Sequence, residues 1–187
     1  TSIEIPQNVT SIGFGAFYDC TGLTRVYISD LSAWCNIKFG SEHSNPLVYA
    51  QNLYINNNVI KDLIISNDID TIGDYAFYGC SGLNTVHIPS SVVSIGYKAF
   101  GNCSSLTGVY ITDIAAWYRT QFLDYTSNPL YYAKKLYVNN SLITDLVIPA
   151  DVTDLSYSLV GCTNLNSIKV EAGNTTYDSR ENCNAVI

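Results

Sequence analysis

Six cysteines and two histidines are the residues with the widest chemical repertoire in this chain, because both types act as nucleophiles, bases and metal ligands. Cys35 and His43 lie close enough in sequence to suggest a nucleophile–base pair. A second copy of this region, described below, has Tyr118 and Thr126 at the two positions. A pair that its own duplicate lacks is better explained by chance. The chain also lacks a Gly-rich phosphate loop and a paired-carboxylate motif, so we expect no catalytic residues and no enzyme.

One position of a repeated pattern is cysteine in four copies: Cys20, Cys80, Cys103 and Cys162. We call this set the cysteine ladder. Stacked repeats lie about 4.8 Å apart, which places equivalent Cβ atoms slightly beyond the usual disulfide range of about 3.5–4.5 Å. We therefore expect free thiols that act as small buried apolar groups. Cys35 and Cys183 lie off the ladder in distant repeats and are expected to be unpaired as well.

Metal and cofactor binding have little support in the sequence. There is no C-x-x-C motif, and His43 and His87 are the only histidines. Acidic residues do occur in turns between expected strands, at Asp68, Asp70, Asp151 and Asp154. Calcium binding is the alternative to ordinary turn-forming and solvated aspartates at these positions. We expect no metal and no cofactor.

A short internal repeat positions these residues. The segment 74–96 (DYAFYGCSGLNTVHIPSSVVSIG) is followed at once by a copy that begins YKAFGNCSSLTGVYI. Ala76 and Ala99 are equivalent, so the period is 23 residues (99 − 76). A unit of this length cannot bury its own apolar face and must stack on copies of itself. The repeat therefore predicts an elongated solenoid, whose function lies on a repeated surface and not in one cleft.

A longer repeat of 83 residues (117 − 34) overlies the short one and relates Trp34 to Trp117. It duplicates two insertions, at about 30–52 and 113–135, each opening with an aspartate suited to cap a helix. An Asn-Pro pair inside each insertion predicts the start of a second short helix. Both tryptophans are expected to be core residues.

Triplets of the type V-x-I alternate apolar, variable and apolar residues, which is typical of strands with one buried face. Nine parallel strands are predicted, near Ile3, Val26, Leu53, Leu63, Val86, Val109, Leu136, Leu146 and Ile168. The Ala-Phe-x-x-Cys segments are too short for more than a turn or two of helix. We expect them to pack on the opposite side of a single sheet.

The pattern A-F-x-x-C-x-x-L-x-x-V-x-I-P resembles the BspA-like (Treponema-type) leucine-rich repeats of bacterial surface proteins. The ending GNTTYDSRENCNAVI, residues 173–187, is similar to a segment of such proteins from gut Bacteroides-type bacteria. The resemblance implies an α/β solenoid: a right-handed superhelix with one parallel sheet of about nine short strands and short helices or turns on the other faces. It also implies secretion or cell-surface display, binding of host or matrix proteins, and no catalytic residues.

Residues 1–187 are expected to form one leucine-rich-repeat block. The chain starts inside a repeat strand without a signal peptide, so we expect it to be a piece of a longer extracellular or cell-surface protein. Its net charge of −7 makes nucleic acid and anionic membranes poor partners. It has no apolar stretch long enough for membrane insertion.

The variable middle residues of the V-x-I triplets are expected on the exposed face of the sheet. Five of them are aromatic or histidine: Tyr27, Tyr54, His87, Tyr110 and Tyr137. Such a stripe stabilises a sheet by cross-strand stacking, and it also suits a binding face of rigid aromatic side chains. The sequence therefore predicts a non-enzymatic adhesion module for protein partners. A carbohydrate-binding module and a structural spacer that displays another domain are the alternatives.

Overall fold

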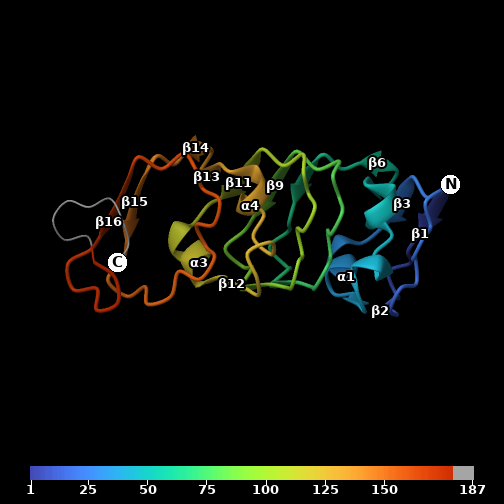
Figure 1. Ribbon diagram of the computed structural model, residues 1–187, viewed down its shortest axis with the longest axis horizontal. Helices are drawn as coiled ribbons and strands as arrows, with labels where there is room; N and C mark the ends of the chain where they lie inside the picture. The colour runs from blue at the N-terminus through green and yellow to red at the C-terminus, as the bar shows by residue number, and fades with distance from the viewer. Residues whose placement is uncertain (179–187) are drawn as a thin grey trace.

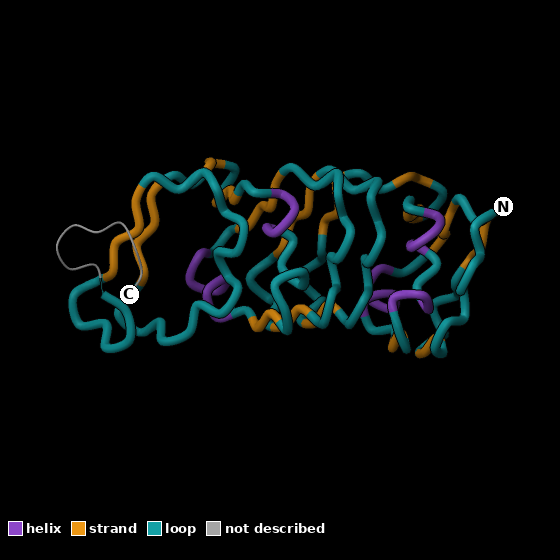
Figure 2. Tube along the Cα trace, viewed as in Figure 1, coloured by secondary structure: helices purple, strands orange, loops and turns teal. Residues whose placement is uncertain are grey.

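The computed structural model describes residues 1–178, and this part of the chain advances along one long axis from the N-terminus to the C-terminus (Figure 1). Short strands form two rows along this axis, and a few short helices lie between and beside them (Figure 2). Most of the described chain is strand, turn or loop. Both rows are made by repeated sequence positions, so the architecture follows from the two periods.

The first row contains a strand at every V-x-I triplet. These strands are β1 (Ser2–Glu4), β3 (Arg25–Ile28), β5 (Leu53–Ile55), β7 (Asp62–Ile64), β9 (Thr85–Ile88), β11 (Gly108–Ile111), β13 (Leu136–Val138), β15 (Asp145–Ile148) and β16 (Ser167–Val170). Most neighbouring members of this row pair in parallel, as expected, but β5 does not pair with β7 and β13 does not pair with β15. The residues on either side of the variable middle position, such as Val86 and Ile88 in β9, are buried, with 0% and 4% exposure.

The prediction of one continuous sheet is wrong, because the first row is divided into three sheets. Their strand orders are β1-β3-β5-β6, β14-β13-β11-β9-β7 and β15-β16. The breaks come from two hairpin strands, β6 (Asn58–Val59) and β14 (Ser141–Leu142), which pair antiparallel with β5 and β13. Each hairpin occupies the strand edge that the next parallel strand would need.

Both hairpins turn at a pair of asparagines. Asn56 and Asn57 have φ angles of 49° and 66°, and Asn139 and Asn140 have 48° and 64°. Two consecutive left-handed residues are what the tightest two-residue hairpin turn requires, and asparagine tolerates this conformation better than most residues. The sequence Asn-Asn therefore dictates the break in each long repeat.

The second row consists of two-residue strands that the sequence patterns did not predict. They are β2 (Ser11–Ile12), β4 (Lys38–Phe39), β8 (Thr71–Ile72), β10 (Ser94–Ile95) and β12 (Gln121–Phe122). They form the sheets β2-β4 and β12-β10-β8. Four of these strands are followed by a glycine, and we call this set the glycine column: Gly13, Gly40, Gly73 and Gly96.

The short helices lie within the two duplicated insertions. In the first copy, α1 (Leu31–Cys35) is followed by the 3-10 helix η1 (Glu42–Ser44) and α2 (Leu47–Ala50), and in the second copy α3 (Ile114–Arg119) is followed by α4 (Leu130–Ala133). The Asp30 carboxylate accepts a hydrogen bond from the Ala33 N–H at 2.8 Å, and the Asp113 carboxylate accepts one from the Ala115 N–H at 2.8 Å. The predicted capping by both aspartates is confirmed.

The two tryptophans tie each insertion to the repeat that follows it. Trp34 is 1% exposed and Trp117 is 2% exposed, which confirms that both are core residues. The Trp34 indole N–H donates to the Ala76 carbonyl at 2.9 Å, and the Trp117 indole N–H donates to the Ser158 carbonyl at 2.8 Å. The long period is therefore preserved in the packing as well as in the sequence.

Candidate binding surface

The middle residues of the first-row strands align across the sheets. Tyr27 is opposite Tyr54, and Tyr110 is opposite both His87 and Tyr137. The hairpin strands add residues directly opposite Tyr54 and Tyr137, which share the same face of the sheet. We call the full set the sheet-face ladder: Glu4, Tyr27, Tyr54, Val59, Ile64, His87, Tyr110, Tyr137, Leu142, Val147 and Lys169.

The ladder is apolar and uncharged between its ends. All nine positions between Glu4 and Lys169 are aliphatic, tyrosine or, at His87, histidine, with no acidic residue, lysine or arginine among them. Its aliphatic members are exposed, and Ile64 and Val147 are 67% and 51% exposed. These side chains contribute little to the core, so core packing within residues 1–178 does not explain why they are apolar.

The aromatic rings of the second long repeat form a parallel stack. The His87 and Tyr110 ring centroids are 4.5 Å apart with an interplanar angle of 11°, and those of Tyr110 and Tyr137 are 4.5 Å apart with an angle of 8°. The stack is possible because Gly108 lies beneath it: a Cβ there would be 3.0 Å from Cε2 of Tyr110. Both faces of the Tyr110 ring are therefore covered, and the stack presents ring edges and hydroxyl groups outward.

The first long repeat has a looser pair. Tyr27 and Tyr54 lie 4.9 Å apart but are tilted by 36°. Arg25 stands there at the position equivalent to Gly108. A side chain at this position leaves no room for the flat arrangement, which explains the difference between the two copies.

The hydroxyl groups of the ladder tyrosines are free of internal hydrogen bonds within residues 1–178. Tyrosines with a structural role use theirs: the Tyr49 hydroxyl accepts from the Asp19 N–H, and the Tyr132 hydroxyl accepts from the Asn102 N–H, both at 2.8 Å. The four ladder hydroxyls make no such bond. They are available to a partner.

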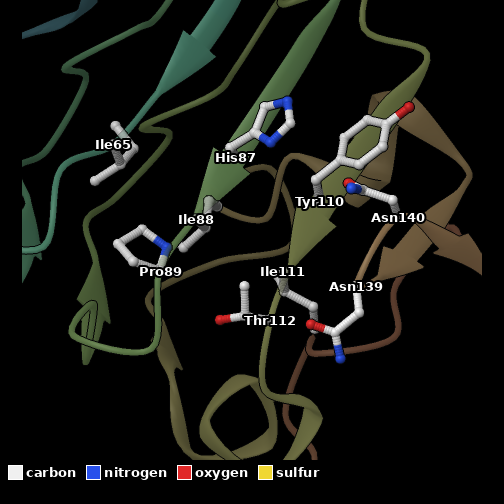
Figure 3. A pocket seen from close by; sticks show the side chains of 9 residues that line it. All are labelled: Ile65, His87, Ile88, Pro89, Tyr110, Ile111, Thr112, Asn139 and Asn140. Atoms are coloured by element: carbon white, nitrogen blue, oxygen red, sulfur yellow. The ribbon is translucent and has the colours of Figure 1, made fainter.

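Two hollows adjoin the ladder at the carboxyl ends of its strands. The C-terminal hollow has a volume of about 300 Å³ and is lined by Ile65, His87, Ile88, Pro89, Tyr110, Ile111, Thr112, Asn139 and Asn140 (Figure 3). The N-terminal hollow has a volume of about 430 Å³ and is lined by Ser2, Ile3, Glu4, Tyr27, Ile28, Ser29, Asn56 and Asn57. The sequence patterns did not predict either hollow. The repeated Asn-Asn pair was the signal that could have indicated them.

The five described cysteines carry free thiols, and Cys183 lies outside the described residues. In the cysteine ladder, Cys80 and Cys103 are fully buried, whereas Cys20 and Cys162 are half-buried. Burial raises the pKa of Cys80 to about 12 and that of Cys103 well above its usual value. Both central thiols therefore stay protonated and unreactive at neutral pH.

The structure does not bring Cys35 and His43 together. Cys35 is fully buried in the core, and burial, helped by the charges of Asp30 and Asp68, raises its pKa to about 12. The His43 ring instead lies 5.1 Å from the Tyr18 ring, and no hydrogen bond joins it to Cys35 in the described chain. A desolvated thiol without a base cannot become a nucleophile.

No metal site is found within residues 1–178. No three histidine, cysteine or acidic side chains lie together there in a group that could hold a metal ion. Two of the turn aspartates have other partners: Asp151 pairs with Arg119 at 2.5 Å, and Asp154 accepts from the Ser156 N–H at 2.7 Å. No described helix is long and apolar enough to cross a membrane.

Stacked repeats of mostly strand, with few short helices and a repeated leucine and isoleucine core, define a leucine-rich-repeat protein. More narrowly, the chain belongs to the BspA type leucine rich repeat region family, whose family model matches six copies over residues 1–39 and 49–185. The recognition made from the A-F-x-x-C pattern is thereby confirmed. The Bacteroides-type origin stays a prediction.

Solved structures similar to this chain include a leucine rich cell surface protein from Faecalibacterium prausnitzii, at 18% identity and a TM-score of 0.35. A leucine-rich repeat protein from Eubacterium ventriosum has 18% identity and a TM-score of 0.36. The matches cover 94% and 90% of this chain but only 61% and 54% of the two solved chains. Among curated proteins, no sequence matches this one.

Proposed function

We propose that this chain is a non-enzymatic binding and adhesion module, secreted or displayed on the cell surface, that recognises a protein partner through the sheet-face ladder. Family membership supports this function, because leucine-rich-repeat proteins generally bind proteins and are generally not enzymes. The proposal includes a single right-handed solenoid block over residues 1–187, with helical insertions at about 30–52 and 113–135, and the two rows of strands within residues 1–178 are consistent with it.

The exposed apolar ladder is the observation that carries the proposal. Exposed apolar patches often mark binding sites, and four large apolar side chains of the ladder are exposed: Val59, Ile64, Leu142 and Val147. Tyrosine is enriched among the side chains that dominate binding energy, since its ring brings a large contact area at low entropic cost. Cross-strand stacking also stabilises the sheet, by roughly 0.2–1 kcal/mol per pair, and is compatible with binding.

Ring geometry favours a protein over a glycan as the partner. Sugars bind aromatic residues by stacking on a free ring face, but His87 and Tyr137 cover both faces of the Tyr110 ring. Ring edges and free hydroxyl groups suit the mixed apolar and hydrogen-bonding surface of a protein. A pure spacer has no need of nine ladder positions in strand order without an acidic residue, lysine or arginine, four of them exposed and five half-buried, so a spacer role is the weaker alternative.

The test compares two quadruple variants. One replaces the ladder residues Tyr27, Tyr54, Tyr110 and Tyr137 by serine. The control replaces four exposed tyrosines outside the ladder: Tyr18, Tyr97, Tyr125 and Tyr157. Biosensor binding is measured against a panel of purified extracellular host and matrix proteins, and circular dichroism checks the fold. The ladder variant should bind a captured protein at least 100-fold more weakly, whereas the control should bind it normally. Equal binding by the ladder variant and the wild-type chain refutes the proposal, as does binding to a glycan array alone.

A further inference from the structure

The two hollows beside the ladder are duplicates of one another. Positions related by the 83-residue period line both: a ladder tyrosine, an isoleucine, a hydroxyl residue and the Asn-Asn pair of a hairpin. The same backbone bond anchors each hairpin, since the Asn139 N–H donates to the Ile111 carbonyl at 3.0 Å and the Asn56 N–H donates to the Ile28 carbonyl at 3.4 Å. The fold therefore builds the same hollow twice.

One equivalent position gives the hollows different charges. Glu4 lines the N-terminal hollow, and His87 stands at the matching position of the C-terminal hollow (87 − 4 = 83). Both face the equivalent tyrosine on the next strand, Tyr27 or Tyr110. Glu4 is the one acidic residue that lines either hollow, and no lysine or arginine lines them.

The rest of each lining matches this difference. In the N-terminal hollow, the hydroxyl groups of Ser2 and Ser29 accompany the Glu4 carboxylate, and such acceptors suit an ammonium or guanidinium group. The C-terminal hollow adds Ile88 and Pro89, which give it an aliphatic floor. Charge complementarity thus separates the two hollows into a cation site and an apolar site.

The hairpin asparagines point to a polypeptide as the occupant. Their side-chain amides make no hydrogen bond to any residue within 1–178. A carboxamide both donates and accepts, and so complements the N–H and C=O groups of an extended backbone. Hollows of this volume lie at the lower end of ligand-site sizes, which fits single side chains.

We propose that the two hollows are paired subsites for one extended segment of the protein partner, with a lysine or arginine in the N-terminal hollow and an aliphatic side chain in the C-terminal hollow. The proposal rests on the proposed function, because the segment belongs to the protein that covers the ladder. The strands β5, β6, β7 and β9 follow β3 before β11, and counting each of the five steps as one strand spacing of roughly 4.8 Å, including the unpaired step from β6 to β7, gives a separation of about 24 Å. An extended peptide covers this span in about seven residues.

The experiment uses capped single residues and a linked peptide as probes. Acetyl-arginine amide, acetyl-leucine amide and a peptide with arginine and leucine seven positions apart are titrated into the ¹⁵N-labelled chain and followed by NMR. Arginine should shift the amide signals of Ser29, Asn56 and Asn57, and leucine should shift those of Thr112, Asn139 and Asn140. The linked peptide should bind at least tenfold more tightly than either residue alone, because the second contact becomes intramolecular.

Two substitutions test whether the residue at position 4 or 87 decides which side chain each hollow binds. Glu4→Gln should weaken the arginine response at least fivefold and leave the leucine response unchanged. His87→Glu should give the C-terminal hollow a new arginine response. Retained arginine binding in Glu4→Gln, or no new response in His87→Glu with an otherwise unchanged spectrum, overturns the proposal.

The outcomes also separate this inference from the proposed function. If the ladder variant loses the captured protein while no probe shifts either hollow, the paired subsites are refuted and the binding face stands. If the probes respond as expected while the ladder variant binds its partner normally, the ladder function is refuted and the subsites stand.

Discussion

Replacing Gly73 by alanine should destabilise the chain far more than the same replacement at Gly13, although both glycines belong to the glycine column. A Cβ at Gly73 would lie 2.7 Å from the Cys35 carbonyl oxygen and 3.4 Å from the Ile37 carbonyl oxygen. Both neighbours are backbone atoms and cannot rotate away as the end of a side chain can. At Gly13, a Cβ would meet no atom within 4 Å.

The size of the effect follows from these contacts. Forcing extra volume into a packed site costs about 1–3 kcal/mol. The clash also weakens the hydrogen bond from the Gly73 N–H to the Cys35 carbonyl, which is 2.8 Å long and contributes about 1 kcal/mol. Gly73→Ala should therefore cost about 2–4 kcal/mol. Gly13→Ala should change stability by less than about 1 kcal/mol, since it only restricts the unfolded chain.

Urea denaturation followed by tryptophan fluorescence and circular dichroism measures both variants. The Gly73→Ala midpoint should fall clearly while the slope with urea stays constant, which marks a change in stability and not in the extent of unfolding. If Gly73→Ala and Gly13→Ala differ by less than about 0.5 kcal/mol, the repeats do not approach one another as closely as this reasoning requires.

Three further outcomes are expected. Asn128→Ala should lower the unfolding free energy by at least about 3 kcal/mol, because the buried amide donates to the Tyr157 and Ser158 carbonyls at 2.7 and 3.2 Å and accepts from the Leu130 N–H at 2.8 Å. The control is Asn58→Ala at an exposed position, and a loss near zero for Asn128→Ala contradicts the prediction. The folded-state pKa of Cys35, about 12, lies above its ordinary 9.0, so the folded chain holds the proton longer, and Cys35 should lower the stability by about 1.4 kcal/mol per pH unit above pH 9, in addition to the falls caused by Cys80 and Cys103. Cys35→Ala should reduce the total slope by that amount in urea titrations at pH 8–11, and an unchanged slope contradicts the prediction. Asn140 has a φ of 64°, so Asn140→Gly should leave the thermal midpoint nearly unchanged, whereas Asn140→Val should cost about 1–2 kcal/mol; equal midpoints would exclude the proposed turn.

The first row of strands was predictable because each strand has its own alternation of buried and variable residues. Its division into three sheets was not recognised. Leu53 and Leu63 are only ten positions apart, which is too short for a repeat that crosses both rows. This spacing and the Asn-Asn pair together indicate a hairpin between the two strands. The second row was missed because a strand of two residues has no periodicity, and only the recurring glycine marks it.

The candidate surface was predictable in its members on the parallel strands, but not in its two hairpin members, Val59 and Leu142, nor in its geometry. Alternation alone placed the tyrosines on the exposed face. The flat stack depends on Gly108, which lies on the same strand as Tyr110 but contacts the rings only after the strands pair. The hollows depend on hairpins that join residues about 28 positions apart, such as Ile111 and Asn139. Contacts of this range are set by tertiary pairing and leave no local pattern.

The glycine column is interrupted in the second long repeat. Leu123 stands where the first copy has Gly40, and the last repeat is one residue shorter than its counterpart, with Val152 to Cys162 replacing Ile69 to Cys80. A cavity of about 650 Å³ lies beside β12, between α3 and residues 151–157. Arg119 and Asp151 bridge its edge at 2.5 Å. The second long repeat therefore differs from the first both at this glycine and in the length of the repeat that follows it.

The two long repeats are alike inside and different outside, which has a consequence for binding. Buried equivalents such as Trp34 and Trp117 make the same hydrogen bonds within 0.1 Å. On the surface, Glu4 and Arg25 in the first copy correspond to His87 and Gly108 in the second. Two identical hollows would not distinguish the two different side chains of the proposed partner segment. Because only the N-terminal hollow has a carboxylate among its lining residues, reversing the proposed segment would place a cation on the aliphatic floor and an apolar side chain against Glu4. The proposed subsites would therefore favour one orientation of the partner segment.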